Sequence, residues 1–386
     1  MRARVLGSPA GRSCQNPRVL PAGPDSLEPE PFEPRAAGLG AAELEAVGQE
    51  PAELEVASPD PGRPRGVRRV RRFLRRSAVV LLALGAALTV ASFAYNLATD
   101  GQAGRPAGLR LIRAGGFDTR YRSWGSTGWP IVLVPGAFET ADTFAALGPV
   151  LGTSHRVFAI DLTGTGYSAT SPPFSASHLA AQLLAFLRAI HLTGANAPVL
   201  VGHSSGAAVI GMAILRDRNA AAGIVFLDGD ARPLPIPALA GWLLINPYRT
   251  TLVRLAVRSD WLIRQAYQSQ CGPSCSPLSA AGVQAWRLPL QQPGFLEVVA
   301  YNLRHGIPSM TSTQLRELRS TAVSKLVIYG RNDPQLSRSD AAAAAASIGA
   351  PPPVAIPGRH LTMISSPRQL ADAISAFMVE VTATDR

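Results

Sequence analysis

Lysine is almost absent from this chain of 386 residues, because Lys325 is the single lysine among its 37 basic side chains. The net charge of +11 is unevenly distributed. Residues 1–62 carry a net charge of −5, residues 63–76 hold eight arginines and no acid, and residues 77–386 carry +8 spread thinly. No basic stretch is interleaved with aromatic residues, as nucleic-acid grooves require. The pattern argues against nucleic acid as a partner.

Cysteine is scarce as well, with Cys14 near the N-terminus and Cys271 and Cys275 in the motif QCGPSC. Two thiols do not complete a tetrahedral zinc site. In an oxidising compartment, Cys271 and Cys275 are expected to form a local disulfide, and two unrelated free cysteines are the alternative. The ring is so short that a disulfide there would stabilise a turn more than the whole fold.

Aromatic residues are few in residues 1–62, which are rich in Pro, Gly, Ala and Glu. Such a composition does not bury enough apolar surface to offset the entropy lost on ordering. We therefore predict a disordered, acidic, Pro-rich tail over residues 1–62.

Charge is missing altogether from residues 77–98, a run of 22 residues that follows the arginine-rich segment 63–76. A helix of that length crosses the roughly 30 Å hydrocarbon layer of a membrane. A buried core helix is the alternative, but such a helix rarely adjoins eight arginines. We predict a transmembrane signal-anchor helix over 77–98. The positive-inside rule then keeps the arginines cytoplasmic and places residues 100–386 outside the cytoplasm.

Cleavage of this segment is the alternative to anchoring. Residues 92–94, Ser-Phe-Ala, form a tolerable cleavage site, and the arginine run loosely resembles a twin-arginine signal. A leader of 76 residues before the apolar run is very long for a cleaved peptide. No cysteine follows the apolar run closely, which argues against a lipoprotein. An uncleaved, single-pass anchor in the cell membrane is favoured.

From about residue 108, short apolar runs alternate with longer helical stretches, which is typical of a parallel sheet covered by helices. Residues 108–230 and 325–386 are interpreted as two parts of one α/β core. Residues 231–324 separate two predicted strands, and this segment is too long for an ordinary loop. Its helical periodicity predicts an inserted helical cap.

Residues 202–206, Gly-His-Ser-Ser-Gly, carry the strongest chemical signal. A serine hydroxyl is a weak nucleophile, so it must be presented on a tight strand-to-helix turn near a base and backbone N–H donors. An apolar strand precedes the motif, a helix of small residues follows it, and a Cβ on either flanking glycine would collide with the turn. The pattern predicts Ser204 as a nucleophile, with a simple Gly/Ser turn as the alternative. His203 is interpreted as a packing residue, and the backbone N–H of Ser205 is well placed to bind an oxyanion.

At this point the chain from about residue 108 to the C-terminus resembles the α/β-hydrolase fold family. Four motifs match in order: VPGAF at 134–138 is similar to a His-Gly-x loop, DLTGTGYS at 161–168 resembles Asp-x-x-Gly-x-Gly-x-Ser, and the Ser204 turn and a C-terminal acid and base follow. The resemblance implies a mostly parallel, doubly wound sheet and an oxyanion hole formed by the N–H groups of Ala137 and Ser205. Pro135 stands where His is common, but the donor is a backbone group, so the role survives. The 161–168 loop is interpreted as structural.

The acid of a serine hydrolase lies at a strand end and orients the imidazole of the base. Asp333, in LVIYGRNDP, fits this position best, and His360, in IPGRHLTMISSP, follows as the base. The intervening residues accommodate one helix and one strand, and the order Ser, Asp, His agrees with this fold. Asp228 and Asp230, after the preceding strand, are the reserve candidates for the acid.

A serine at position 204 also separates subfamilies, because epoxide hydrolases and haloalkane dehalogenases of this fold use a carboxylate there. Acyl transfer to water remains, and the resemblance implies no metal and no organic cofactor. We expect a carboxylesterase or lipase-like enzyme. The alternatives are thioester hydrolysis, carbon–carbon bond hydrolysis or cofactor-free perhydrolysis on the same triad, or a catalytically silent binding domain.

The cap segment is rich in large apolar side chains such as Trp261, Leu262, Trp286 and Leu288. Most of them are expected to form the core of the cap itself. The alternatives are that some line an apolar acyl or alcohol pocket or dip toward the nearby membrane surface. The small-molecule substrate is therefore expected to be an apolar ester.

Overall fold

The computed structural model describes residues 65–101, 103–234 and 245–384. The tail expected over residues 1–62 lies outside the described residues. Chain contacts divide the protein into Met1–Arg65 and Gly66–Arg386. The elements below belong to the second of these units, apart from the first residue of the first helix.

The arginine block and the apolar run form one continuous helix, α1 (Arg65–Ala98), rather than a separate segment followed by a helix. Residues Arg69–Ala98 are long and apolar enough to cross a membrane, as an anchor or a signal segment does. Only 6% of the most apolar window is buried within the protein. A buried core helix does not show such exposure, so that alternative is wrong.

The core is built on an eight-stranded sheet with strand order β1-β2-β4-β3-β5-β6-β7-β8. Strand β2 pairs antiparallel with β1, with which it forms a hairpin, and with β4. The other pairings, along the order β4-β3-β5-β6-β7-β8, are all parallel. The strands are β1 (Arg110–Ala114), β2 (Phe117–Trp124), β3 (Pro130–Val134), β4 (Arg156–Ile160), β5 (Val199–His203), β6 (Gly223–Leu227), β7 (Ser324–Gly330) and β8 (Val354–Ile356). The prediction of a mostly parallel sheet is confirmed.

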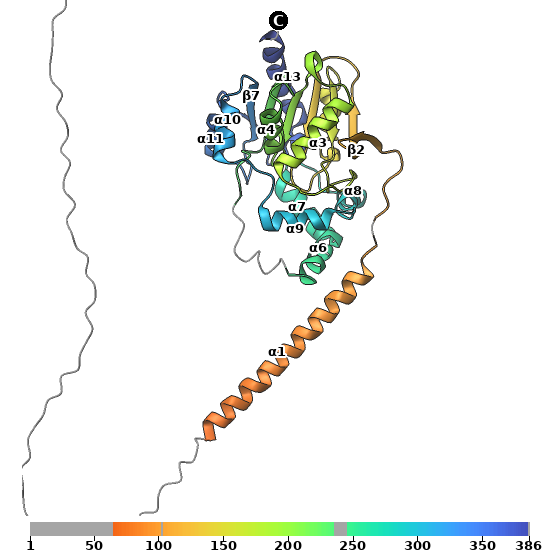
Figure 1. Cartoon of the computed structure of the whole chain (residues 1–386), viewed down its shortest axis with the longest axis vertical. Helices are drawn as coiled ribbons and strands as arrows, with labels where there is room; N and C mark the ends of the chain where they lie inside the picture. Colours follow the sequence, from red (N-terminus) through yellow and green to blue (C-terminus); the bar gives the residue numbers. More distant parts are fainter. Residues whose placement is uncertain (1–64, 102, 235–244, 385–386) are drawn as a thin grey trace, which may run out of the picture. The chain divides into compact units, whose positions relative to one another are not determined.

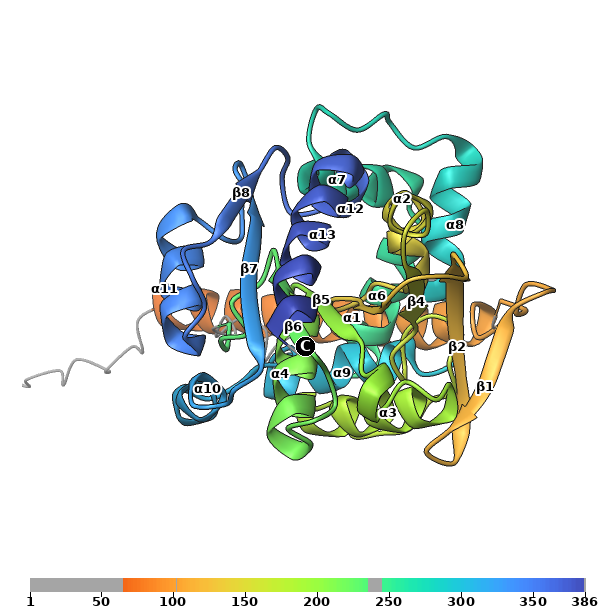
Figure 2. The ribbon, with the colours of Figure 1, turned by 90° about the horizontal axis from the view of Figure 1, so that it is seen from above.

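Helices cover both faces of this sheet. As a result, the central strands β3, β5 and β6 are buried along their whole length. Alternate residues of β3 enter different cores: Val132 and Val134 pack on one side, Ile131 and Leu133 on the other. One face carries α3 (Ala176–Ala189), α4 (Gly206–Arg216), α10 (Ser312–Arg319) and α11 (Arg338–Ile348). The other carries η1 (Ala141–Phe144), α2 (Leu147–Leu151), α12 (Thr362–Ser365) and α13 (Pro367–Thr384). Helices α3 and α4 pack side by side, as Figure 2 shows, and a short turn, η2 (Gly194–Asn196), precedes β5.

Within the described residues, four helices between β6 and α10 make up the segment expected to form the cap, and they lie together at one end of the sheet in Figure 1. They are α6 (Tyr248–Arg258), α7 (Asp260–Cys271), α8 (Ala280–Leu290) and α9 (Phe295–His305). Residues 235–244 of the expected cap lie outside the described residues. Helix α10 departs from the expected cap boundary at residue 324, because Leu315 and Leu318 are buried in the core with α4. Helical periodicity identifies a buried face but not the neighbour that covers it.

Candidate active site

The turn between β5 and α4 holds Ser204 in a strained conformation. Its φ of 50° lies in the left-handed region, which is uncommon for residues other than glycine and concentrates at functional sites. The flanking glycines are required. A Cβ on Gly202 would lie 2.4 Å from the carbonyl oxygen of Gly206, and a Cβ on Gly206 would lie 2.6 Å from that of Val134. The expected collision is therefore confirmed, and the turn presents Ser204 at the carboxyl end of a central strand.

The loops after β7 and β8 bring Asp333 and His360 together. The two side chains form a buried pair in which His360 Nδ1 lies 2.9 Å from Asp333 Oδ2. Asp333 is held in turn, because its Oδ1 accepts a hydrogen bond of 2.7 Å from the backbone N–H of Gln335. This arrangement selects the tautomer with the proton on Nδ1 and leaves Nε2 as the nitrogen able to accept a proton.

Ser204 and His360 line the same small cavity, which has a volume of about 40 Å³ and also borders Ser205 and Asp228. Within residues 103–234 and 245–384, no hydrogen bond joins the Ser204 hydroxyl to the His360 ring. Catalytic hydrogen bonds are often long in ligand-free proteins and tighten when substrate binds. The structure thus brings the three predicted residues to one site, with the acid–base pair already formed.

The loop after β3 passes directly over Ser204, since a Cβ on Gly136 would lie 2.9 Å from the Cβ of Ser204. Ala137 follows in this loop, and Phe138 adopts a positive φ of 65°. Ala137 and Ser205 both line a second small cavity of about 20 Å³. In the described part of the chain, no acceptor contacts the N–H of Ala137 or Ser205. Both predicted donors therefore remain available beside Ser204.

The reserve acids are engaged elsewhere. Asp228 is buried, with Oδ1 accepting a hydrogen bond of 2.6 Å from the N–H of Gly330 and Oδ2 accepting one from the Thr362 hydroxyl. Burial raises the pKa of Asp228 to about 7. Asp230 is paired with Arg232 at 3.0 Å. Neither carboxylate contacts the ring of His360, whereas Asp333 does.

A second carboxylate–imidazole pair, Glu139–His203, lies beside the first. His203 Nδ1 is 2.7 Å from Glu139 Oε2, and its Nε2 is 2.8 Å from the carbonyl oxygen of His360. The carbonyl only accepts hydrogen bonds and an ionised carboxylate does likewise, so both ring nitrogens of His203 donate and the ring is an imidazolium. Burial lowers the pKa of His203, but the Glu139 carboxylate outweighs it and raises the pKa to about 9.

Sequence reasoning missed this pair. His203 was expected to be a packing residue, and it is fully buried, yet it also carries charge. Glu139 also accepts a hydrogen bond of 3.0 Å from the N–H of Gly136. The pair therefore links the loop after β3, the serine turn and the loop that bears His360. A glutamate directly after the oxyanion loop was the available signal, but its partner is 64 residues away.

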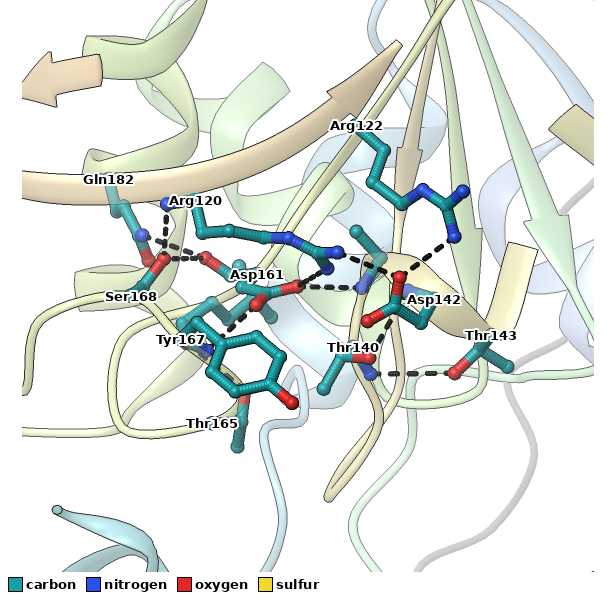
Figure 3. A network of polar contacts seen from close by, with 12 residues as sticks. Arg120, Arg122, Thr140, Asp142, Thr143, Asp161, Thr165, Tyr167, Ser168 and Gln182 are labelled. Atoms are coloured by element: carbon teal, nitrogen blue, oxygen red, sulfur yellow. Dashed lines mark hydrogen bonds and ion pairs between the residues drawn. The ribbon is translucent and has the colours of Figure 1, made fainter. Parts of the chain in front are cut away.

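The Gly-rich loop after β4 is anchored by Asp161, as its interpretation as structural implies (Figure 3). Asp161 Oδ1 lies 3.0 Å from Arg120 Nη1 and accepts a hydrogen bond of 2.7 Å from the N–H of Ala141. Its other oxygen accepts one of 2.8 Å from the N–H of Tyr167. Arg120 extends to Asp142 at 2.7 Å. These contacts connect three segments: the turn at residues 141–142, which follows the loop after β3, the Gly-rich loop after β4, and β2.

A larger cavity of about 380 Å³ lies between core and cap, and Phe138 of the oxyanion loop lines it. Thr140 and Ala146 belong to its core side, and Tyr267 and Trp286 belong to its cap side. Phe138 also makes an edge contact with Phe295 of α9, with ring centroids 5.7 Å apart. Among residues 65–384 that are described, no group of three or more His, Cys, Asp or Glu side chains is arranged to hold a metal ion.

Cys271 and Cys275 form a disulfide at the end of α7, so the alternative of two free cysteines is wrong. The same end of α7 contacts the loop that carries His360. The carbonyl of Gln270 accepts a hydrogen bond of 3.2 Å from the N–H of Leu361, next to His360. Cap and catalytic loop are therefore connected by backbone contacts.

Residues 131–373 match the profile of the alpha/beta hydrolase family. N-formylmaleamate deformylase of Pseudomonas putida is 31% identical over 98 residues, which are 25% of this chain and 35% of that protein. The match thus spans about a third of the length of that curated relative.

Solved structures of this fold superpose over most of the chain. A thermophilic esterase from Thermogutta terrifontis is 22% identical with a TM-score of 0.57, covering 71% of this chain and 99% of its own. A bacterial membrane phospholipase A is 18% identical with a TM-score of 0.57, covering 82% of this chain and 99% of its own. At these identities the likeness establishes the fold.

Proposed function

The chain belongs to the alpha/beta hydrolase family, and we propose that it is a serine hydrolase that cleaves esters with Ser204, His360 and Asp333. The observation that carries this proposal is the buried Asp333–His360 pair, whose imidazole lines one cavity with a serine on a strained turn. A carboxylate-oriented imidazole beside a partly exposed serine is the arrangement that activates a hydroxyl for acyl transfer.

In the proposed reaction, the Ser204 oxygen attacks the carbonyl carbon of the ester while His360 Nε2 takes the hydroxyl proton. The imidazolium then gives that proton to the leaving alcohol as the tetrahedral intermediate collapses to an acyl-enzyme. Water attacks the acyl-enzyme in the second half, with His360 again moving the proton and releasing the acid. Asp333 holds the ring in the required tautomer and stabilises its positive charge.

Charge develops on the carbonyl oxygen during both attacks, and the N–H groups of Ala137 and Ser205 are the proposed donors to it. The loss of one such donor typically costs 10²–10³-fold in kcat, about 3–4 kcal/mol. The two residues line one cavity, and a Cβ on Gly136, which precedes Ala137, would lie 2.9 Å from the Cβ of Ser204; both observations support the assignment. The Glu139–His203 pair is proposed to position this loop and His360 relative to each other, since it contacts both.

An ester with an apolar acyl or alcohol part is the proposed substrate class. The cavity lined by Phe138, Tyr267 and Trp286 supports an apolar substituent, because large aromatic side chains contribute apolar surface there. The same triad supports thioester and carbon–carbon bond hydrolysis and perhydrolysis, so a panel of activated substrates decides among them.

We also propose that α1 anchors the enzyme in the cell membrane, with residues 1–76 cytoplasmic and the hydrolase outside the cytoplasm. The support is the exposed apolar helix preceded by eight arginines within residues 63–76. A reporter that is active only outside the cytoplasm, fused after Asp100, is expected to be active. A signal from a cytoplasm-specific reporter at the same position would overturn the proposed orientation.

The first experiment is labelling of the full-length protein with a fluorophosphonate probe, which reacts with activated serines. We expect wild type to be labelled at Ser204 and Ser204→Ala to be unlabelled. His360→Ala is expected to lose labelling too, whereas Ser205→Ala, which keeps the backbone N–H, is expected to retain it. Absence of labelling in a folded wild-type protein would contradict the enzyme proposal. Labelling that survives in His360→Ala would assign the base elsewhere.

A further inference from the structure

The apolar helix α1 carries one stripe of polar side chains near its C-terminal end. Thr89, Ser92 and Asn96 follow a spacing of three and four residues, which places them on one helix face, and Thr99 comes directly after the helix. Ser92 is buried within the protein, whereas Phe93 and Leu97 on the remaining surface are exposed. Polar groups in the hydrocarbon layer of a membrane require hydrogen-bond partners.

The cap helix α6 supplies those partners. The hydroxyl of Tyr248 lies 2.6 Å from that of Thr89, and Asn96 Nδ2 donates to the carbonyl of Pro247 at 3.0 Å. Thr251 donates to Asn96 Oδ1 at 3.2 Å. Toward the end of both helices, Arg254 Nη2 pairs with Asp100 at 2.5 Å. These contacts place the first two turns of α6 against the C-terminal part of α1.

The depth of these contacts follows from helix geometry. Residues 77–98 extend about 33 Å at 1.5 Å per residue, close to the roughly 30 Å hydrocarbon thickness. Thr89 lies about 14 Å before the end of the apolar run by the same rise. The side chain of Tyr248, which is hydrogen-bonded to Thr89, therefore lies at the depth of the outer half of the bilayer.

The surface of the cap beside this contact is apolar and cationic. Leu252 and Leu255 on α6 are each 49% exposed, and Trp261 and Leu262 at the start of α7 are 66% and 41% exposed. Trp261 and Leu262 are therefore not among the apolar cap residues that form the core of the cap. Helix α6 also carries three arginines and no acid. Exposed apolar side chains next to arginines match the acyl chains and phosphates of a lipid surface.

We propose that α6 and the first turn of α7 lie in the outer leaflet beside α1, so that the cap is docked on a phospholipid bilayer. We call Leu252, Leu255, Trp261 and Leu262 the lipid face. The proposal rests on the proposed membrane anchoring and adds a second membrane contact from the catalytic domain. Continuity with the anchor helix favours a bilayer over a second copy of the chain as the occupant of this face.

The test uses full-length protein in liposomes of phosphatidylcholine and phosphatidylglycerol. A single cysteine, Leu255→Cys in a Cys14→Ser background, is labelled under non-reducing conditions with an environment-sensitive fluorophore. The matched control is Val379→Cys on α13, an apolar side chain that is 68% exposed. We expect brominated lipids to quench the Leu255 probe several-fold more than the Val379 probe, and aqueous iodide to show the opposite order.

Equal quenching of both probes by iodide would overturn the docking. Shielding of the Leu255 probe from iodide without quenching by brominated lipids would assign the face to a protein contact and would also overturn it. A probe at Leu84→Cys, in the middle of α1, separates this failure from failure of the anchor. Lipid quenching at Leu84 alone would leave the anchor standing, whereas no lipid quenching at either position would reject both.

The polar stripe has a test of its own. Asn96→Leu removes the donor and the acceptor that α6 uses, and we expect it to reduce lipid quenching at Leu255 several-fold while leaving Leu84 unchanged. Phe93→Leu, on the exposed side of the same turn, is the control and is expected to change neither. Unchanged quenching at Leu255 in Asn96→Leu would reject the pairing of α1 with α6.

Discussion

Two carboxylate–imidazole pairs lie side by side in the site, with their rings 4.8 Å apart, and they differ in what the second nitrogen meets. In the Glu139–His203 pair, both nitrogens contact acceptors. In the Asp333–His360 pair, one nitrogen contacts the acid and the ring borders the cavity of Ser204. A buried carboxylate partner is therefore not enough to make a histidine a base. The second nitrogen must also be free to exchange a proton with a substrate or nucleophile.

The largest expected effect separates the two histidines by activity. We expect His360→Ala to lower kcat for a soluble ester by at least about 10⁴-fold, since single losses within a serine triad reach this size. For His203→Gln, which keeps donor capacity, we expect a loss below about 10²-fold because it acts through positioning. Steady-state kinetics on full-length protein in detergent measure both. Equal losses would remove the functional distinction between the two pairs.

The carboxylates are expected to divide in the same way. Asp333→Asn should lower kcat by roughly 10³–10⁴-fold, because the amide no longer stabilises the imidazolium or its tautomer. Asp228→Asn is the matched control, since it changes a buried acid that contacts Gly330 and Thr362 instead. A larger loss in Asp228→Asn than in Asp333→Asn would return the acid role to the reserve candidate.

The Glu139–His203 pair is expected to affect the stability of the protein more than its kcat. Glu139→Gln leaves the buried His203 without its counter-charge, and breaking a buried pair from one side costs roughly 3–5 kcal/mol. We expect this variant to unfold at clearly lower urea concentration than wild type while its kcat falls less than about tenfold. A free energy of unfolding equal to that of wild type would mean that His203 is neutral in the folded protein.

The pH dependence of the free energy of unfolding also tests whether His203 is charged in the folded protein. The pKa of His203 is about 9 in the folded protein, above the ordinary histidine value of 6.5, so the folded chain binds the extra proton between these pH values. Its contribution is complete below pH about 6.5 and is lost as the pH rises through about 9, amounting to at most about 3 kcal/mol. Thermal unfolding between pH 6 and 10 measures it, and the same fall should be absent from Glu139→Gln.

The smallest expected effect concerns Asp230, the other reserve acid. Its side chain is partly exposed and pairs with Arg232. We expect Asp230→Asn to change the free energy of unfolding by less than about 1 kcal/mol, as surface ion pairs do, and to leave kcat unchanged. A loss of activity comparable to that of Asp333→Asn would contradict the assignment of the acid.

Local sequence signals predicted the parts of the site that depend on backbone geometry. The glycines at positions 202 and 206 indicate a turn with no room for a Cβ. Asp333 and His360 each follow a strand, and the carboxyl ends of these strands meet at one edge of the sheet. The apolar strands of the parallel sheet were likewise visible as buried runs. Such features need only neighbours within a few residues or a known strand order.

Features that depend on distant partners were missed. The charge of His203 requires Glu139, and the contact becomes visible only when β3 and β5 are paired in space. The hairpin of β1 and β2 was not identified, because arginines interrupt its apolar alternation, although Gly115-Gly116 at its turn was an available signal. The membership of α10 in the core and the start of α1 within the arginine block depend on packing and on helix propagation, respectively.

The end of α7 has a mechanical consequence for the cap. The hydrogen bond from the N–H of Leu361 to the carbonyl of Gln270 and the one of 3.0 Å from Arg359 to the carbonyl of Ser269 fasten the end of α7 to the loop of His360, and the disulfide closes the chain locally at that end. An outward motion of α7 must therefore break these two hydrogen bonds or move the loop of His360 with it. A displacement of α7 would therefore move the His360 loop before it affected the turn that carries Ser204.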